Sequence, residues 1–316
     1  MLRRTPPKDE SHTQLGHVPK VAACSGVSLT YTRVPSYPAL MDPLQTKADA
    51  LLANLSRRGS LIVAYSGGVD SSYLAYAAHR ALGERSLAVT AESPSYPRSH
   101  RRMAEEVVRR FGIPHRFVKT HEMESPDYVR NPSNRCYFCK SELFDVLEGL
   151  RRELDYDAVT YGLNTDDTHD FRPGQQAAEE HRVLSPLLEV GLSKREIREL
   201  SREAGLPTAD LPASACLSSR IPYGMEVTPE KLRQIDRAED ALRELGYRQV
   251  RVRHHGDLAR IELSPDELPR ALDPERLRCM SRALHEVGFR WVSLDLDGYR
   301  TGSLNEVLFI QPPPER

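Results

Sequence analysis

The residues best suited to chemistry in this sequence form a loop directly after the apolar run at residues 61–64. The loop consists of Ser66, Gly67, Gly68, Val69, Asp70, Ser71 and Ser72. Glycine lets a ligand approach the backbone, and the N–H groups that open the following helix attract anions. The Lys-[Ser/Thr] pair of the Walker loop is missing. The pattern is that of enzymes that split ATP into AMP and pyrophosphate, with Asp70 helping to place Mg²⁺. A glycine turn without a ligand is the weaker alternative.

Three of the five cysteines could hold a metal group. Cys136 and Cys139 form a CxxC pair just before a predicted helix, and Cys216 lies in a loop far along the chain. An odd number of cysteines in a long chain without a secretory signal indicates thiols for chemistry or metal rather than disulfides. Three thiolates suit a [4Fe–4S] cluster with one open iron, or a zinc site completed by water or histidine. Buried apolar thiols are the remaining alternative.

Charged side chains elsewhere give weaker signals. Arg251 and Arg253 alternate along a predicted strand, so both guanidinium groups face one side and could hold a phosphate or a carboxylate. Without other information, a solvated strand face is the better interpretation of this pair. Asp167 follows a predicted strand and is a candidate for the ATP or Mg²⁺ site, and Glu262 is a weak candidate for a metal-contacting carboxylate.

Alternating strands and helices must position these residues. Strands are predicted at residues 61–64, 86–90, 114–119 and 157–164, and helices at residues 43–58, 70–82, 98–111, 140–150 and 193–204. The alternation predicts an α/β fold with a doubly wound parallel sheet, whose ligands bind beyond the carboxyl ends of the strands. The Ser66 loop, Ser93 and the pair Asp166-Asp167 lie at such ends and should converge on one crevice.

Beyond residue 205 the pattern predicts a smaller α+β domain. Helices are predicted at residues 229–245 and 274–287, and strands at residues 249–253, 259–263 and 289–296. Ser193 with Glu196 predicts a capping box, and Thr228 predicts a helix N-cap. We therefore expect a disordered tail (1–41), a nucleotide-binding domain (42–209), a cysteine-bearing interdomain loop (210–227) and a domain for substrate binding and oligomerisation (228–312).

Charge and hydropathy argue against other classes of protein. The 44 basic and 45 acidic residues give a formal net charge of −1, which offers no general attraction for nucleic acid. No apolar run approaches the roughly 20 residues that span a bilayer. No apolar region follows the N-terminal arginines, which argues against a secretory signal. We expect a cytoplasmic protein without a membrane or nucleic-acid partner.

The motifs resemble those of the LarE family, ATP-dependent sulfur transferases among the pyrophosphate-loop (PP-loop) ATP pyrophosphatases. The resemblance covers about residues 42–310. It rests on SGGVDS from Ser66, DFRPG from Asp170, ASAC ending at Cys216, SSRIPYG from Ser218, VRVR from Val250, DLARIEL from Asp257, and GYR from Gly298 with Gly302. The loop alone is shared with NAD synthetase, GMP synthetase and tRNA thiolases, whereas the Cys216 and Arg-x-Arg segments are more specific.

The resemblance implies a PP-loop fold of the adenine nucleotide α-hydrolase type and a particular reaction. ATP with Mg²⁺ adenylates a carboxylate of pyridinium-3,5-biscarboxylic acid mononucleotide and releases pyrophosphate. Sulfur then displaces AMP and gives a thiocarboxylate for the nickel-pincer cofactor. Arg251 and Arg253 match the positions that hold the substrate phosphate. Relatives assemble as homo-oligomers.

The family also implies two alternative sources of sulfur. In one branch a single cysteine, matched here by Cys216, gives up its own sulfur and becomes dehydroalanine. In another, three cysteines hold an iron–sulfur cluster that carries sulfide. Cys136, Cys139 and Cys216 match all three positions, which favours the cluster branch.

Two other functions remain open at this point. A tRNA thiolase also combines this loop with a CxxC pair and a distant cysteine, but the near-neutral charge and the lack of an RNA-binding appendage count against it. A non-catalytic ATP-binding or iron–sulfur sensor would bind ATP without turning it over. Pyrophosphate release that depends on the pyridinium substrate distinguishes the sulfur transferase from the sensor.

Overall fold

The computed structural model describes residues 42–169, 173–212, 215–300 and 303, all of which belong to one compact unit. Several sequence predictions fall outside these residues: the tail at 1–41, residues 170–172 of the DFRPG segment, residues 213–214 of the ASAC segment, and Gly302. Within the described part of the chain, no helix combines the length and the apolar composition needed to cross a membrane.

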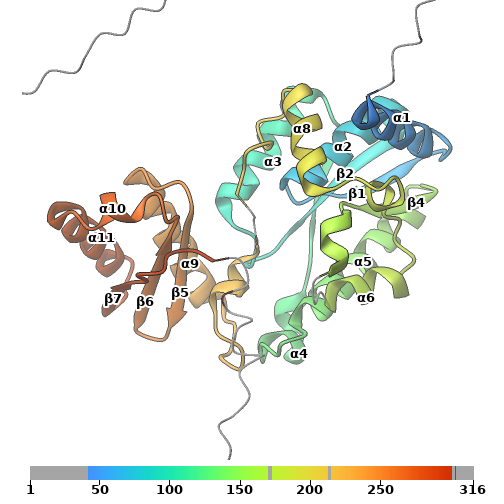
Figure 1. The fold of residues 1–316 in the computed structure, drawn as a ribbon. Coiled ribbons are helices and arrows are strands. Elements are labelled where there is room, and N and C mark those ends of the chain that lie inside the picture. The colour runs from blue at the N-terminus through green and yellow to red at the C-terminus, as the bar shows by residue number, and fades with distance from the viewer. Residues whose placement is uncertain (1–41, 170–172, 213–214, 301–302, 304–316) are drawn as a thin grey trace, which may run out of the picture. The chain divides into compact units, whose positions relative to one another are not determined.

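A four-stranded parallel sheet forms the first half of the described chain (Figure 1). Its strands are β1 (Leu61–Ala64), β2 (Ser86–Glu92), β3 (His115–Lys119) and β4 (Ala158–Tyr161), in the order β3-β2-β1-β4. Leu61 pairs in parallel with Ser86 of β2 and with Ala158 of β4, so the carboxyl ends of these three strands lie at one edge of the sheet. The predicted doubly wound α/β fold is confirmed.

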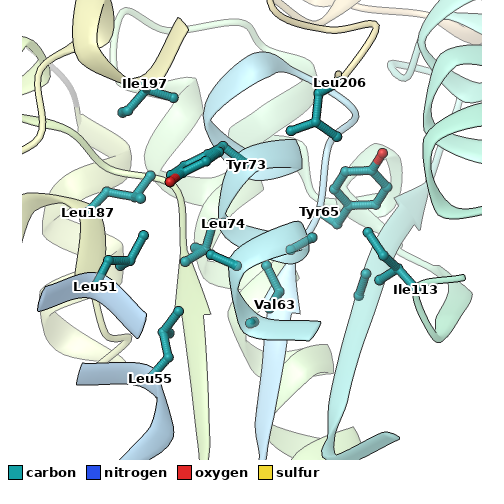
Figure 2. Close-up of a cluster of buried hydrophobic side chains, with 14 of the residues drawn as sticks. Leu51, Leu55, Val63, Tyr65, Tyr73, Leu74, Ile113, Leu187, Ile197 and Leu206 are labelled. Atoms are coloured by element: carbon teal, nitrogen blue, oxygen red, sulfur yellow. The ribbon is translucent and has the colours of Figure 1, made fainter. Parts of the chain in front are cut away.

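Helices cover both faces of this sheet, because successive side chains of β1 point to opposite sides. Leu61 and Val63 belong to a core shared with α1, α2, α3 and α8, part of which Figure 2 shows. Ile62 and Ala64 belong to a second core, shared with α5 and α6. These helices are α1 (Pro43–Ser56), α2 (Val69–Leu82), α3 (Arg98–Phe111), α5 (Arg135–Glu153), α6 (Pro173–Glu180) and α8 (Lys194–Glu203). Shorter segments are α4 (Pro126–Val129), α7 (Pro186–Glu189) and the 3₁₀ helices η1 (Gly83–Arg85), η2 (Glu122–Glu124) and η3 (Thr165–His169).

The predicted caps of two helices are confirmed. The Ser193 Oγ accepts a hydrogen bond from the N–H of Glu196 at 3.3 Å, and the Glu196 carboxylate accepts one from the N–H of Ser193 at 2.8 Å. This capping box begins α8. The Thr228 hydroxyl accepts from the N–H of Lys231 at 3.3 Å and begins α9 (Pro229–Glu244).

The start of α5 differs from the prediction. The helix begins at Arg135, five residues before the predicted start at residue 140. Phe138 packs against an apolar cluster around Tyr128. This contact favours a helical backbone in the residues that precede residue 140. Cys136 and Cys139 therefore lie in the first turn of α5, three positions apart on one face, rather than before the helix.

A three-stranded sheet forms the second half of the described chain. Its strands are β5 (Val250–His255), β6 (Leu258–Leu263) and β7 (Trp291–Leu294), with β5 antiparallel and β7 parallel to β6. It is accompanied by α9, α10 (Leu268–Ala271) and α11 (Pro274–Glu286). These elements enclose a core of their own, so the predicted smaller α+β part is confirmed. The boundaries at residues 209 and 228 stay a prediction.

Candidate active site

The loop at residues 66–68 turns sharply between β1 and α2. Gly67 has a φ of 73°, in the left-handed region that favours glycine. A Cβ at this position would lie 3.0 Å from the Cβ of Ala104 and 3.2 Å from the carbonyl oxygen of His100. The approach of α3 to the turn therefore requires glycine here.

The start of α2 leaves its N–H groups available to a ligand. Gly68 is the N-cap residue and has no side chain to bind them. The Ser71 Oγ accepts a hydrogen bond from the N–H of Ser66 at 3.2 Å and lies 3.0 Å from the Ser66 Oγ, which fixes the turn. Backbone N–H groups and the positive end of a helix dipole together attract phosphate. This arrangement fits the pyrophosphate end of ATP.

Asp70 lies in the first turn of α2 and forms an ion pair with Lys194, the first residue of α8. The Asp70 Oδ2 accepts a hydrogen bond from the ammonium group, whereas the buried Oδ1 has no hydrogen-bond partner among the described residues. A carboxylate oxygen in this position fits the preference of Mg²⁺ for oxygen ligands. Gly162 permits the arrangement, since a Cβ there would lie 2.9 Å from the backbone nitrogen of Ser71.

The acidic residues after β4 have partners within the fold. The Asp166 Oδ2 accepts from the N–H of Lys194 at 2.8 Å and holds the start of α8. The Asp167 Oδ2 accepts from the N–H of Asn164 at 3.3 Å. Asn164 is buried, and none of the described residues forms a hydrogen bond with its Nδ2. The role of Asp167 in binding ATP or Mg²⁺ stays a prediction, and Asn164 adds an amide group at the same strand end.

A turn at residues 93–96, directly after β2, contacts both the phosphate loop and the Cys216 segment. The Tyr96 hydroxyl donates to the carbonyl oxygen of Ser66 at 3.1 Å. The carbonyl oxygen of Ser95 accepts from the N–H of Leu217 at 2.9 Å. One short turn therefore links the loop suited to ATP with the residue next to Cys216.

Arg220 holds the backbone of the Cys216 segment from the interior. Its fully buried guanidinium group donates to the carbonyl oxygens of Ala215 at 2.7 Å and of Cys216 at 2.9 Å. The same group forms two hydrogen bonds with Glu239, at 2.7 and 3.0 Å. The N–H of Ser219 also donates to the Cys216 carbonyl, at 3.0 Å. The position of Cys216 is thus set through its own backbone and does not depend on its thiol.

Positive charge gathers around this anchor. Glu239 also accepts from Arg243 at 2.9 Å, and although burial opposes ionisation, Arg220 lowers the pKa of Glu239 to about 2. Burial and the nearby arginines lower the pKa of His100 to about 4, which leaves its imidazole neutral at pH 7. Burial and the charge of Arg220 lower the pKa of Arg251 to about 10. Three guanidinium groups around one carboxylate favour the binding of an anion.

Arg253 and Glu262 form a buried ion pair. From the sequence, Arg253 was a candidate for binding phosphate and Glu262 a weak candidate for contacting a metal. Nε and Nη2 of Arg253 donate to the two carboxylate oxygens at 2.9 and 2.7 Å, and Nη1 donates to the carbonyl oxygen of Ser219 at 2.8 Å. Arg260 also pairs with Glu262, at 3.0 Å. Every nitrogen of this guanidinium group and both oxygens of this carboxylate therefore have partners in the fold.

The structure brings Cys136, Cys139 and Cys216 into one neighbourhood. Burial raises the pKa of the Cys139 thiol, and its electrostatic interactions with Cys216 and Glu122, and more weakly with Cys136, raise it further. Cys136 is exposed, and the other two are partly buried. The first turn of α5 and the Cys216 segment therefore lie close together.

Asn131 fastens these two segments together. It is fully buried and has a φ of 57°, which is uncommon outside glycine. Its Nδ2 donates to the carbonyl oxygens of Pro222 at 2.7 Å and of Met225 at 3.0 Å, and its own carbonyl accepts from the N–H of Gly224 at 3.0 Å. The segment that leads into α5 and the chain that follows Cys216 are thus joined at several points.

The geometry bears on which metal group the cysteines could hold. Among the residues that the structure describes, no three His, Cys, Asp or Glu side chains are placed to hold one metal ion. A [4Fe–4S] cluster would be held by Cys136, Cys139 and Cys216 and would leave one iron without a protein ligand. The three-thiol donor set fits such a cluster, and its presence stays a prediction.

Comparison with known proteins identifies the family. A family model described as asparagine synthase matches residues 48–134, which include the phosphate loop. A glutamine-hydrolyzing GMP synthase chain of Thermococcus kodakarensis is 28% identical over 195 residues, which is 55% of this chain and 61% of that protein. The uncharacterized protein slr1717 of Synechocystis is 46% identical over 265 residues, which is 84% of this chain and 99% of that protein.

The deciding similarity is to the pyridinium-3,5-bisthiocarboxylic acid mononucleotide synthase of Lactiplantibacillus plantarum. It is 34% identical over 271 residues, which is 85% of this chain and 97% of that protein. The chain belongs to the LarE family. This confirms the resemblance, and together with the PP-loop it makes the chain an ATP-using enzyme.

Three residues at this site were not predicted from the sequence to have a role of their own. Lys194 follows a helix cap, where charged residues are ordinarily solvated, and only the fold brings it to Asp70. Arg220 lies in the SSRIPYG segment, but its burial and its pairing with Glu239 have no local pattern. Asn131 gave one usable signal, because Asn-Pro favours a turn.

Proposed function

We propose that this LarE-family protein is an ATP-dependent sulfur transferase acting on pyridinium-3,5-biscarboxylic acid mononucleotide. A substrate carboxylate oxygen attacks the α-phosphorus of ATP, the bond to the bridging oxygen breaks, and pyrophosphate leaves with the electron pair. A sulfur nucleophile then attacks the acyl carbon and displaces AMP, leaving a thiocarboxylate. Adenylation is needed because a free carboxylate is a poor electrophile and lacks a good leaving group.

The observation that carries this proposal is the turn at residues 93–96. It connects the loop suited to ATP with the Cys216 segment by two hydrogen bonds, Tyr96 to Ser66 and Leu217 to Ser95. Activation at the phosphate loop and sulfur delivery from the cysteines must act on the same carboxyl carbon. A direct connection between the two segments is what such a sequence of steps requires.

For the substrate phosphate we propose Arg251, supported by Arg253 as a buried structural partner. Arg251 shares a face of β5 with Arg253, is buried, and lies with its Cζ 5.2 Å from the centre of the Tyr299 ring. Burial among other guanidinium groups disfavours its charge, as its lowered pKa shows. A phosphate bound there would offset this cost through charge-assisted hydrogen bonds.

The sulfur, in this proposal, is delivered through all three cysteines. A [4Fe–4S] cluster on Cys136, Cys139 and Cys216 would leave one iron without a protein ligand, where a replaceable sulfide could be held. At Cys139 the helix dipole at the start of α5 opposes the burial that raises the pKa of the thiol. The backbone anchor through Arg220 holds the third. Loss of sulfur from Cys216 alone is the alternative within the same family.

Product analysis tests the function. The anaerobically purified protein is incubated with ATP, Mg²⁺, sulfide and the mononucleotide, and products are identified by mass spectrometry. We expect AMP, pyrophosphate and a thiocarboxylate, with no pyrophosphate when the mononucleotide is omitted. ADP and phosphate as products would contradict the PP-loop assignment. ATP binding without turnover would indicate a sensor, and turnover that requires tRNA would indicate a tRNA thiolase.

Replacing Arg251 by alanine tests the phosphate assignment. We expect the KM for the mononucleotide to rise about ten- to hundredfold, because a charge-assisted hydrogen bond to phosphate is lost. Binding of ATP, measured by calorimetry, should be unchanged. Arg253→Ala is the comparison: it breaks the ion pair with Glu262 and should lower the Tm. An unchanged KM in Arg251→Ala would show that this arginine only supports the strand.

A further inference from the structure

Lys194 occupies a position that is electrostatically unfavourable for a cation. It is the first residue of α8, a ten-residue helix, and the positive end of a helix dipole disfavours positive charge. Its backbone N–H is held by Asp166 at 2.8 Å, so the helix start is fixed. From there the side chain reaches Asp70 in the first turn of α2. The steps of the proposed reaction do not otherwise use this lysine.

Mg²⁺ and the Lys194 ammonium group require the same carboxylate. Asp70 presents one oxygen to Lys194, and its other oxygen is buried without a hydrogen-bond partner in the part of the chain that the structure describes. A divalent cation on that second oxygen would stand within a few ångströms of the ammonium group, and the two charges would repel in a partly buried site. The phosphates of ATP at the start of α2 offer the ammonium group another partner. A lysine, as a charge on a flexible stem, can make that change.

We propose that Lys194 is a built-in counter-ion that competes with Mg²⁺ for Asp70 and passes to the pyrophosphate part of ATP when the metal binds. Without nucleotide, the ammonium group neutralises Asp70 and weakens metal binding. When Mg²⁺ and ATP enter together, Lys194 leaves the carboxylate and contacts the phosphates that will depart. This deepens the proposed function and rests on its ATP-cleaving half.

Metal titration of the nucleotide-free protein tests the competition. Mn²⁺, followed by electron paramagnetic resonance, replaces Mg²⁺ as the probe. Lys194→Met should bind Mn²⁺ about three- to tenfold more tightly than the parent protein, because one ion pair no longer opposes the metal. Lys194→Arg keeps the positive charge and should bind Mn²⁺ less tightly than Lys194→Met.

A second ion pair to the same helix, from Lys47 of α1, serves as a matched control. Lys47 pairs with Glu196 at 2.8 Å, with side-chain exposures of 34% and 16%, against 32% and 18% for Lys194 and Asp70. Lys47→Met therefore removes an ion pair of similar burial without approaching the phosphate loop. Its Mn²⁺ affinity should equal that of the parent protein. Equal affinities in the parent and Lys194→Met, including no detectable binding by either, would overturn the proposal.

Binding of a non-cleavable nucleotide tests the proposed transfer of Lys194 from Asp70 to the phosphates. With saturating Mg²⁺, calorimetry should show that Lys194→Met binds α,β-methylene-ATP about tenfold more weakly than the parent protein, since a cationic contact to phosphate is lost. Unchanged nucleotide affinity would overturn the transfer to phosphate. Neither measurement uses the pyridinium substrate or sulfur, so failure of sulfur transfer with these results intact would contradict the proposed function alone.

Discussion

Replacing Asp70 by asparagine is expected to lower AMP formation by about 10²- to 10³-fold, the cost of removing one electrostatic group from a preorganised site. Asparagine has nearly the shape of aspartate but cannot offer an anionic oxygen to Mg²⁺. Without the metal, charge developing on the departing pyrophosphate is left to the α2 N–H groups and Lys194. The measurement is the rate of acyl-adenylate and AMP formation by mass spectrometry under single-turnover conditions.

A matched aspartate separates this effect from a general loss of an ion pair. Asp295 pairs with Arg260, and its side chain is 16% exposed, against 18% for Asp70. Asp295→Asn should therefore retain the parent rate of AMP formation. The thermal stability of both variants should be compared by circular dichroism. If Asp70→Asn turned over ATP at the parent rate, the metal would have to be held elsewhere and the loop assignment would be wrong.

The second large effect concerns the cysteines. Anaerobically purified protein is expected to be brown, with about four irons per chain, the content of one [4Fe–4S] cluster. Cys136→Ala, Cys139→Ala and Cys216→Ala should each lose most of this iron and all multiple-turnover sulfur transfer. Acyl-adenylate formation should survive in all three, because the phosphate loop is untouched. Iron and sulfide assays with visible spectra are the measurements.

Cys279→Ala is the control for thiol loss. Cys279 lies on α11, far along the chain from Cys136, Cys139 and Cys216, and is partly buried. Its replacement should leave iron content and sulfur transfer at the parent level. The opposite mechanism has a distinct signature: colourless protein, active in Cys136→Ala, that converts Cys216 to dehydroalanine after one turnover. That result would replace the cluster by sacrifice of Cys216.

Sequence patterns predicted the fold where local and global preferences agree. The run at residues 61–64 is apolar on both sides and became the central strand β1, with its alternate side chains in two different cores. The Ser193 capping box and the Thr228 cap could also be predicted from the sequence, because each joins residues only three positions apart. The turn between β1 and α2 could be predicted because its glycines and the start of the helix are adjacent in the chain.

Ion pairs between residues far apart in the chain could not be predicted from the sequence. Arg253 alternates with Arg251 on a strand, and the pattern cannot show that one of them is neutralised by a carboxylate on the neighbouring strand. Likewise, nothing near Lys194 reveals Asp70, 124 positions earlier in the chain. The start of α5 was missed because the contact of Phe138 with the core, rather than helix propensity, extends the helix to Arg135.

The buried pair of Arg220 and Glu239 has a dynamic consequence for the reactive loop. A cysteine on an ordinary surface loop would sample many positions through frequent local opening. Here the carbonyl of Cys216 is bonded to a guanidinium group whose partner carboxylate belongs to α9. Opening the loop alone would leave the buried carboxylate of Glu239 without its partner Arg220. The loop and α9 should therefore open as one cooperative unit. We therefore expect the backbone N–H of Cys216 to exchange as slowly as those of α9, although its backbone geometry is that of a loop.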